Sequence, residues 1–246
     1  MGADQNLDWQ ALTASALEWW RDAGVDVLVE DAPFAWLDAP APIEPATPAP
    51  HPSFASSPAA PAAALPDTLE AFAAWRAGEQ APDRDWGGAA FASRGPADAS
   101  IMVLLDCPER GDREALLEGA VGALFDRMLA AIGQSRETVL LASVCARRPP
   151  IGRVPRDVEA RLGEIARHHA GLVAPKRLLV MGDAATRAIL TTNAAEARGR
   201  YHPLHHKNGT VTQVVATHHP RLLIERPAAK AEAWRDLLLL NGELPG

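Results

Sequence analysis

Short apolar runs alternate with longer amphipathic segments through the second part of the chain. Four short runs are predominantly apolar and bounded by turn residues, namely residues 100–106, 138–144, 176–182 and 210–217. Runs of this length are typical of strands that are buried on both faces, because the side chains on both sides of the sheet must then be apolar. The pattern therefore predicts four buried strands.

Amphipathic segments with helix-start and helix-stop residues separate these runs. They are residues 66–77, 113–133, 154–175, 183–191 and 227–240. The first has Asp67 or Thr68 as its N-cap and Glu70 placed for a capping box. Strands that alternate with helices indicate a parallel sheet covered on both faces. We predict an α/β fold, a three-layer α/β/α sandwich with a central four-stranded, mainly parallel sheet.

The first part of the chain has a different pattern. Residues 7–23 carry apolar side chains near helical spacing and are followed by Gly24, which predicts a helix. Residues 40–66 contain nine prolines and nine alanines, a composition typical of a semi-extended linker. The predicted organisation is an N-terminal helical segment (1–37), a Pro/Ala-rich linker (38–64) and the α/β/α domain (65–246).

Composition restricts the kind of protein. The two cysteines, Cys107 and Cys145, are too few for a disulfide framework or a four-cysteine metal site. No uncharged apolar run is long enough to predict a membrane span, and the acidic start lacks the basic residues of a secretory signal. We expect a soluble cytoplasmic protein that binds no metal and no membrane.

Charge is distributed unevenly along the chain. Residues 1–100 carry a net charge of −11, whereas residues 101–246 carry +4 and seven of the eight histidines. This asymmetry is compatible with a nucleic-acid surface confined to the second part. An ordinary solvated face explains the same small positive charge, and the charge alone favours this interpretation.

Three of the four predicted strands end in residues that could take part in binding or catalysis. They are Asp106-Cys107-Pro108, Ser143 and His218-His219-Pro220. Ligands of open α/β sheets bind at the carboxyl ends of the strands, so these residues are predicted to share a site. Asp106 also has a simpler interpretation, since an acid after a strand often caps a helix or forms a turn. His202, His205 and His206 are predicted to lie in a solvated loop.

One segment resembles a known family. The stretch "ATHHPRLLIERPAAKAEAWRDLLLL" (216–240) is similar to the terminal motif of the uracil-DNA glycosylase superfamily, and in particular to its bacterial family 4 branch. The similarity extends over roughly residues 65–240, about 70% of the chain. The resemblance implies hydrolysis of the N-glycosidic bond of uracil, or of a related deaminated base, in the base-excision repair of DNA.

The sequence also departs from the family pattern. The family's Gly-Glu-Ala-Pro-Gly motif reads Leu-Asp-Cys-Pro-Glu at residues 105–109. The phenylalanine that stacks on uracil has no counterpart, and Leu116 and Leu117 lie in its neighbourhood. The asparagine that reads the uracil edge corresponds to Ser143. Arg147 stands at a ligand position of the family's four-cysteine iron–sulfur cluster, so no cofactor is expected.

The resemblance assigns roles to individual residues. It implies that His219 stabilises the departing base and that Asp106 acts near the sugar, as the two catalytic residues. The substrate-binding candidates are Cys107, Pro108, Ser143, His218 and Pro220. The candidates for contacting single- or double-stranded DNA are Arg147, Arg148, Arg153 and Arg221.

A second interpretation stays open. The fold could be a catalytically degenerate glycosylase that serves as a DNA-binding or protein-interaction module, with the N-terminal segment recruiting a protein partner. The retained His219-Pro220 motif favours an enzyme, whereas the lost glycine, phenylalanine and asparagine favour the module.

Overall fold

The computed structural model describes residues 14–15, 18, 64–152 and 154–242. The chain divides into two compact units, residues 1–60 and 61–246. Ala14, Ser15 and Glu18 are helical, but the rest of the predicted 7–23 helix, nearly all of the predicted linker and Arg153 lie outside the described residues.

A five-stranded sheet forms the centre of the second unit. Its strands are β1 (Ile101–Leu105), β2 (Val139–Ser143), β3 (Arg177–Met181), β4 (His202–His205) and β5 (Val211–Thr217). They are arranged in the order β2-β1-β3-β5-β4. The first four in this order are parallel, and β4 is antiparallel to β5. The predicted α/β class with a mainly parallel sheet is confirmed.

The predicted number of strands was one too low. The segment that was predicted to be a solvated loop contains β4 (His202–His205), which pairs with β5 at one edge of the sheet. Its side chains alternate between partly buried and exposed positions, and it carries too few apolar residues to be recognised as a buried strand. Its pairing with β5 decides its conformation.

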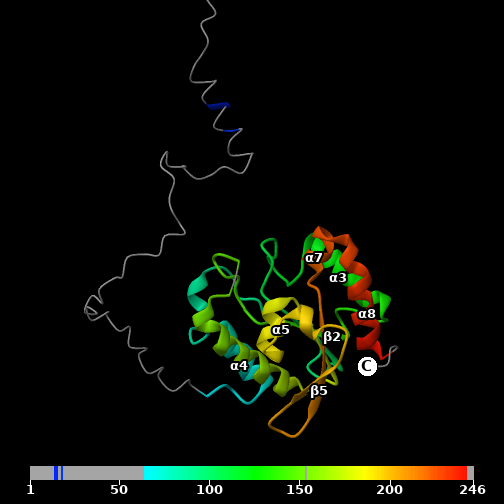
Figure 1. The fold of residues 1–246 in the computed structure, drawn as a ribbon. Helices are drawn as coiled ribbons and strands as arrows, with labels where there is room; N and C mark the ends of the chain where they lie inside the picture. The colour runs from blue at the N-terminus through cyan, green and yellow to red at the C-terminus, as the bar shows by residue number, and fades with distance from the viewer. Residues whose placement is uncertain (1–13, 16–17, 19–63, 153, 243–246) are drawn as a thin grey trace, which may run out of the picture. The chain divides into compact units, whose positions relative to one another are not determined.

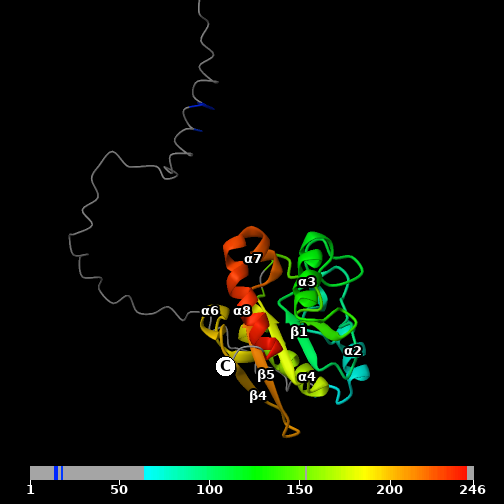
Figure 2. The same cartoon turned by 90° about the vertical axis from the view of Figure 1, so that its right-hand side faces the viewer.

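Helices cover both faces of the sheet (Figure 1). The helices and 3-10 turns of the second unit are α2 (Leu69–Ala77), η1 (Arg84–Trp86), α3 (Gly119–Ala131), α4 (Arg156–Val173), α5 (Asp183–Leu190), α6 (Ala194–Ala197), α7 (Pro220–Glu225), η2 (Pro227–Ala229) and α8 (Lys230–Asn241). In Figure 1, α4 and α5 lie on one side of the strands, and α3, α7 and α8 lie on the other. The turned view in Figure 2 shows the β4–β5 hairpin extending from the end of the domain away from α7.

Two apolar cores result from this layering. Met102 and Leu104 of β1 pack with residues of α4 and α5, whereas Val103 and Leu105 pack with residues of α3 and α8. All five residues of β1 are buried. Alternate side chains of a strand point to opposite faces, so a strand covered by helices on both faces must be apolar throughout, as the sequence pattern predicted.

Helix α3 begins six residues later than the start of its predicted segment. The carboxylate of Asp112 accepts hydrogen bonds from the backbone N–H groups of Leu117 and Glu118, and Glu118 accepts from residues 113–115. Leu117 and Gly119 have positive φ angles of 58° and 65°. Local side-chain acceptors thus satisfy these N–H groups in a loop, which competes with the helix.

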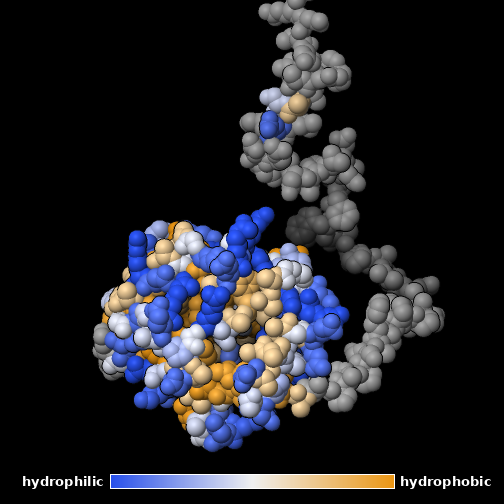
Figure 3. Space-filling model, turned by 180° about the vertical axis from the view of Figure 1, so that it is seen from behind, coloured by the Kyte–Doolittle hydropathy of each residue, from blue (hydrophilic) through white to orange (hydrophobic). Residues whose placement is uncertain are grey.

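The surface of the described unit is mixed. Figure 3 shows hydrophilic and hydrophobic side chains interspersed on the face opposite to that of Figure 1. In the part of the chain that the structure describes, no helix has the length and apolar character needed to cross a membrane.

Candidate active site at the carboxyl ends of the strands

The predicted site residues come together at one edge of the sheet. Leu105 is in register with Ser143 of β2 and with Met181 of β3, and Met181 is in register with Thr217 of β5. The residues that follow these strand ends therefore emerge at one level. In Figure 1 this is the upper edge, at which β5 leads into α7.

His219 occupies a buried position at the start of α7. It is the N-cap of this helix, its side chain is only 5% exposed, and its Nδ1 accepts a hydrogen bond from the backbone N–H of Arg221 over 3.2 Å. Burial, together with the positive charge of Arg221, lowers the pKa of His219 to about 3. The ring is therefore neutral near pH 7, and because Nδ1 accepts, its proton resides on Nε2.

An acid that the sequence did not single out faces this ring. Glu109 Oε1 lies 3.6 Å from His219 Nε2 and accepts a hydrogen bond from Arg221 Nη1 over 2.7 Å. The Glu109 side chain is 11% exposed. Because His219 is neutral, the ion pair of Glu109 is with Arg221 and not with His219. The one signal in the sequence was an acid in the loop after a predicted strand, at a family glycine position.

Asp106 binds the start of a helix, as its simpler interpretation predicted, and it also lies at the candidate site. Its Oδ1 accepts a hydrogen bond from the backbone N–H of Ala185 in the first turn of α5, over 2.6 Å. Gly182 has φ 102°, and a Cβ at this position would lie 2.5 Å from Asp106 Oδ2, so only glycine permits this approach. Burial raises the pKa of Asp106 to about 6, although the N–H groups of Ala185 and Ala184 oppose the shift.

Cys107 and Pro108, which follow Asp106, are buried, and so is Cys145 in the loop after β2. Cys107 and Cys145 are free thiols in the interior. Burial raises the pKa of Cys107 to about 11 and also raises the pKa of Cys145. Pro108 is buried and its carbonyl accepts a hydrogen bond from Arg148 Nη1 over 2.8 Å. The Ser143 hydroxyl donates to the carbonyl of Cys145 over 2.6 Å, so its proton is already engaged within the chain.

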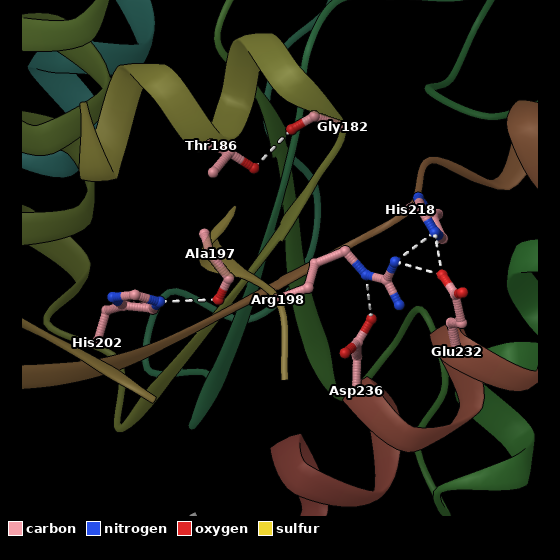
Figure 4. Close-up of polar contacts among 8 residues, drawn as sticks. All are labelled: Gly182, Thr186, Ala197, Arg198, His202, His218, Glu232 and Asp236. Atoms are coloured by element: carbon pink, nitrogen blue, oxygen red, sulfur yellow. Dashed lines mark hydrogen bonds and ion pairs between the residues drawn. The ribbon is translucent and has the colours of Figure 1, made fainter. Parts of the chain in front are cut away.

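His218 has different surroundings from its neighbour His219. Its Nε2 lies 3.1 Å from Glu232 Oε2 and also contacts Arg198. Arg198 donates to Glu232 and to the buried Asp236, over 2.7 Å and 2.8 Å. Hydrogen bonds from Arg198 and His218 lower the pKa of Glu232 to about 2. Figure 4 shows His218 directed toward Arg198 and Glu232, so it belongs to a polar network between the β5–α7 junction and α8.

The predicted DNA-binding arginines differ in orientation. Arg147 Nη2 donates to the carbonyl of Ala77 over 3.1 Å, and its Nη1 is buried without a hydrogen bond. Arg148 reaches Pro108 in the loop after β1. The Arg221 side chain is 43% exposed beside Glu109. Arg148 and Arg221 thus lie at the edge that carries His219, whereas Arg147 points into the protein.

The fold and this edge define an α/β protein with a candidate ligand site at the carboxyl ends of its parallel strands. A model of the uracil DNA glycosylase superfamily matches residues 80–238, and the chain belongs to this superfamily. It is 26% identical over 162 residues to the type-4 uracil-DNA glycosylase of Pyrobaculum aerophilum, covering 62% of this chain and 82% of the relative. It is 28% identical over 162 residues to the corresponding protein of Archaeoglobus fulgidus, covering 62% and 80%.

The cysteine side chains of this protein do not fit the iron–sulfur cluster that the family resemblance implies. Such clusters are held by four thiolates, and this chain has two cysteines. Both are buried, with raised thiol pKa values. Within the described residues, no group of three or more histidine, cysteine, aspartate or glutamate side chains is arranged to hold a metal ion.

Proposed function

We propose that this protein is a DNA glycosylase that hydrolyses the N-glycosidic bond of uracil, or of a related deaminated base, in base-excision repair. One observation carries the proposal. His219 is buried and neutral, and its Nδ1 is held as an acceptor by the N–H of Arg221. A neutral imidazole with its proton fixed on Nε2 is a preorganised hydrogen-bond donor at a sheet edge where a ligand binds.

This donor acts on the base as the bond breaks. Cleavage of the glycosidic bond leaves negative charge on the departing base and positive charge on the sugar. The Nε2–H of His219 would stabilise the charge that develops on a base oxygen, and preorganised donors of this kind contribute most when they are shielded from water. Because its pKa is near 3, His219 is neutral at pH 7, and its Nε2–H donates a hydrogen bond without transferring its proton to the base.

A carboxylate completes the chemistry on the sugar side. Asp106 would orient the attacking water and face the cationic sugar. Its pKa of about 6 leaves it mostly ionised at neutral pH. The N–H groups of Ala185 and Ala184 hold this carboxylate at the start of α5, which fixes its orientation for the proposed role.

Selection of the base is expected to be weak. The hydroxyl of Ser143 is engaged by the Cys145 carbonyl, and serine is shorter than the amide that reads uracil in the family. Each lost base-reading group is expected to reduce discrimination by roughly 1–3 kcal/mol. We therefore propose hydrolysis with relaxed specificity among deaminated bases.

The proposal extends to partners, cofactors and lineage. DNA is the partner, with Arg148 and Arg221 at the site edge and with Cys107, Pro108 and Pro220 as the buried frame around Asp106 and His219. We propose a divergent member of the bacterial family 4 branch that works in the cytoplasm without an iron–sulfur cluster. The purified protein should be colourless, and stoichiometric iron with visible absorption would contradict this.

A second function has a specific observation in its favour. The carboxylate of Glu109 lies 3.6 Å from His219 Nε2, where negative charge opposes an anionic leaving base. This arrangement favours a catalytically degenerate module that binds DNA, or a protein through the N-terminal segment, without cleaving it. The same carboxylate is paired with Arg221, and this ion pair moderates the repulsion.

The experiment compares three histidine variants on oligonucleotides that contain uracil, hypoxanthine or xanthine, followed by alkaline cleavage of the abasic product. His219→Asn keeps an acceptor for the Arg221 N–H and should lower the rate on the order of 10²-fold or more. His218→Ala should largely spare the chemical step. His205→Ala, at an exposed position of the edge strand β4, is the matched control. A wild-type protein without activity on any of these bases would favour the module.

A further inference from the structure

Two helices on one side of the sheet leave an apolar groove between them. Helices α3 and α8 cover the same face of the sheet as α7, and Figure 2 shows all three on the side turned toward the viewer. The groove encloses about 210 Å³ and is lined by residues of these three helices. Seven of its nine lining residues are apolar, and the other two are Arg127 and Lys230.

The apolar lining repeats at helical spacing on both walls. On α3 it consists of Leu124, Met128 and Ala131, and on α8 it includes Ala233 and Leu237. Residues three and four positions apart lie on one face of a helix, so each wall turns a continuous apolar strip toward the groove. The strip from Leu124 to Ala131 spans about 10 Å, the rise of roughly two helical turns. The groove therefore has the length to receive two turns of another helix.

Trp234 supplies an exposed aromatic side chain beside a buried apolar floor. It is 42% exposed, whereas Met128 and Leu223 of the same groove are buried. Tryptophan is enriched among the residues that contribute most to binding in protein interfaces, and methionine adapts its shape to an incoming side chain. Covering Trp234 removes apolar surface from water, which stabilises a complex. The groove thus combines an aromatic anchor with an adaptable floor.

Both charged residues of the groove are cationic. Arg127 lies on α3 and Lys230 begins α8, and both are exposed. The acids nearest to them in the sequence, Asp126 and Glu232, form ion pairs with other arginines over 2.6 Å and 2.7 Å. Within the described residues, no acidic side chain lines the groove. A partner with carboxylates beside an apolar strip is therefore complementary to it in charge.

The walls of the groove favour a helical occupant over an extended one. Backbone groups inside α3 and α8 are used within these helices, so an extended peptide would leave its own N–H and C=O groups unpaired against apolar side chains. A helix satisfies these groups internally. A DNA single strand fits less well, because Trp234 is the one aromatic ring in the described lining and the apolar floor offers no partners to the base edges.

We propose that this groove is a docking site for an acidic amphipathic helix of a partner protein. The helix would lay apolar side chains at positions i, i+4 and i+7 against the lining, and its flanking carboxylates would pair with Arg127 and Lys230. Neither His219 nor Asp106 lines the groove, so the inference goes beyond base hydrolysis. A docked partner would be held to the protein without occupying the candidate active site.

The test uses the full chain and three labelled synthetic peptides of about 14 residues, roughly four helical turns. The first carries leucines at helical spacing with glutamates on both flanks. The second has lysines in place of the glutamates, and the third has the composition of the first in scrambled order. In fluorescence anisotropy the glutamate peptide should bind about tenfold or more tightly than either of the others. Equal affinities for the three peptides would overturn the proposal.

Charge reversal and truncation assign the binding to the groove. Arg127→Glu combined with Lys230→Glu should reverse the preference, so that the lysine peptide binds more tightly. Trp234→Ala should weaken binding of the glutamate peptide by about tenfold or more. All three side chains are exposed, so the variants should fold. Arg156→Glu combined with Lys176→Glu is the matched control, with the same change of net charge at exposed positions outside the lining. An unchanged preference in the groove variant would overturn the proposal.

Two further measurements address other occupants of the groove. A single-stranded oligonucleotide that displaces the glutamate peptide at lower concentration than the unlabelled peptide does would assign the groove to nucleic acid. Self-association of the wild type in analytical ultracentrifugation that is lost in Trp234→Ala would assign it to a second copy of the chain. We expect neither result, and either would overturn the proposed partner. None of these measurements needs glycosylase activity, so failure of the proposed function and failure of the docking site are distinguishable.

Discussion

The backbone N–H of Arg221 donates a hydrogen bond to Nδ1 of His219 over 3.2 Å. This contact caps helix α7 and at the same time fixes the tautomer of a buried, neutral ring. A histidine in this position cannot be protonated without losing the cap, because protonated imidazole has no acceptor. The stability of the β5–α7 junction and the proposed hydrogen-bond donation by His219 Nε2 therefore both depend on the protonation state of this ring.

The first prediction follows from the lowered pKa of His219. Its pKa is 6.5 in an unfolded chain and about 3 in the fold, so its contribution to stability is present above pH 6.5 and is lost as pH falls toward 3. The loss should approach about 1.4 kcal/mol per pH unit in this window. Urea unfolding at pH 7 and pH 5 should show a smaller pH dependence for His219→Asn than for the wild type. Parallel curves for the two proteins would contradict the lowered pKa of His219.

The second prediction concerns Asp106, for which the sign is opposite. Its pKa is raised from 3.8 to about 6, so its protonated form is favoured in the folded state. This contribution is fully present below pH 3.8 and is lost as pH rises through 6. Asp106→Asn should therefore gain stability relative to the wild type between these values. The gain should level off above pH 6.

The pH dependence of the reaction rate should also show the ionisation of Asp106. If the carboxylate of Asp106 orients water, the single-turnover rate of the wild type should rise with pH through about 6 and then level off. Asp106→Asn should be slower and should lack this rise. A rise that persists in the variant would assign the titration to another residue.

The third prediction concerns the ion pair between Glu109 and Arg221. Glu109→Gln removes a negative charge next to the Nε2–H of His219 and frees the Arg221 guanidinium. Both changes favour an anionic leaving base, so uracil cleavage should become several-fold faster. Glu114→Gln, on an exposed acid of the same loop, is the matched control. A slower Glu109→Gln variant would show that this carboxylate takes part in the reaction.

The fourth prediction separates two neighbouring arginines. Arg148→Ala should weaken DNA binding for all sequences and reduce the salt dependence of the affinity by about one phosphate contact. Arg147→Ala should mainly reduce stability, because its guanidinium is directed toward the Ala77 carbonyl. Salt titration of binding and thermal unfolding of both variants distinguish these effects. An equal reduction of the salt slope by both variants would place Arg147 on the DNA surface.

The pattern of apolar and polar residues was enough to predict the α/β architecture of the second unit, four of the five strands of its sheet and the edge that carries the candidate site. Continuous apolar runs such as that of β1 leave little choice, because burial on both faces excludes polar side chains at every position. Because Asp106 and His219 each stand at the end of a predicted strand, the sequence located both residues at the same edge of the sheet.

The contacts that these residues make depend on how distant parts of the chain pack together. The β4 strand depends on pairing with β5 rather than on its own propensity. Glu109 lies at the candidate site because its carboxylate is paired with Arg221, more than a hundred positions away in sequence, beside His219. Arg147 and Arg148 are adjacent and chemically identical, and only distant backbone carbonyls direct one inward and the other to the site. Such contacts join residues far apart in the chain, and no local pattern encodes them.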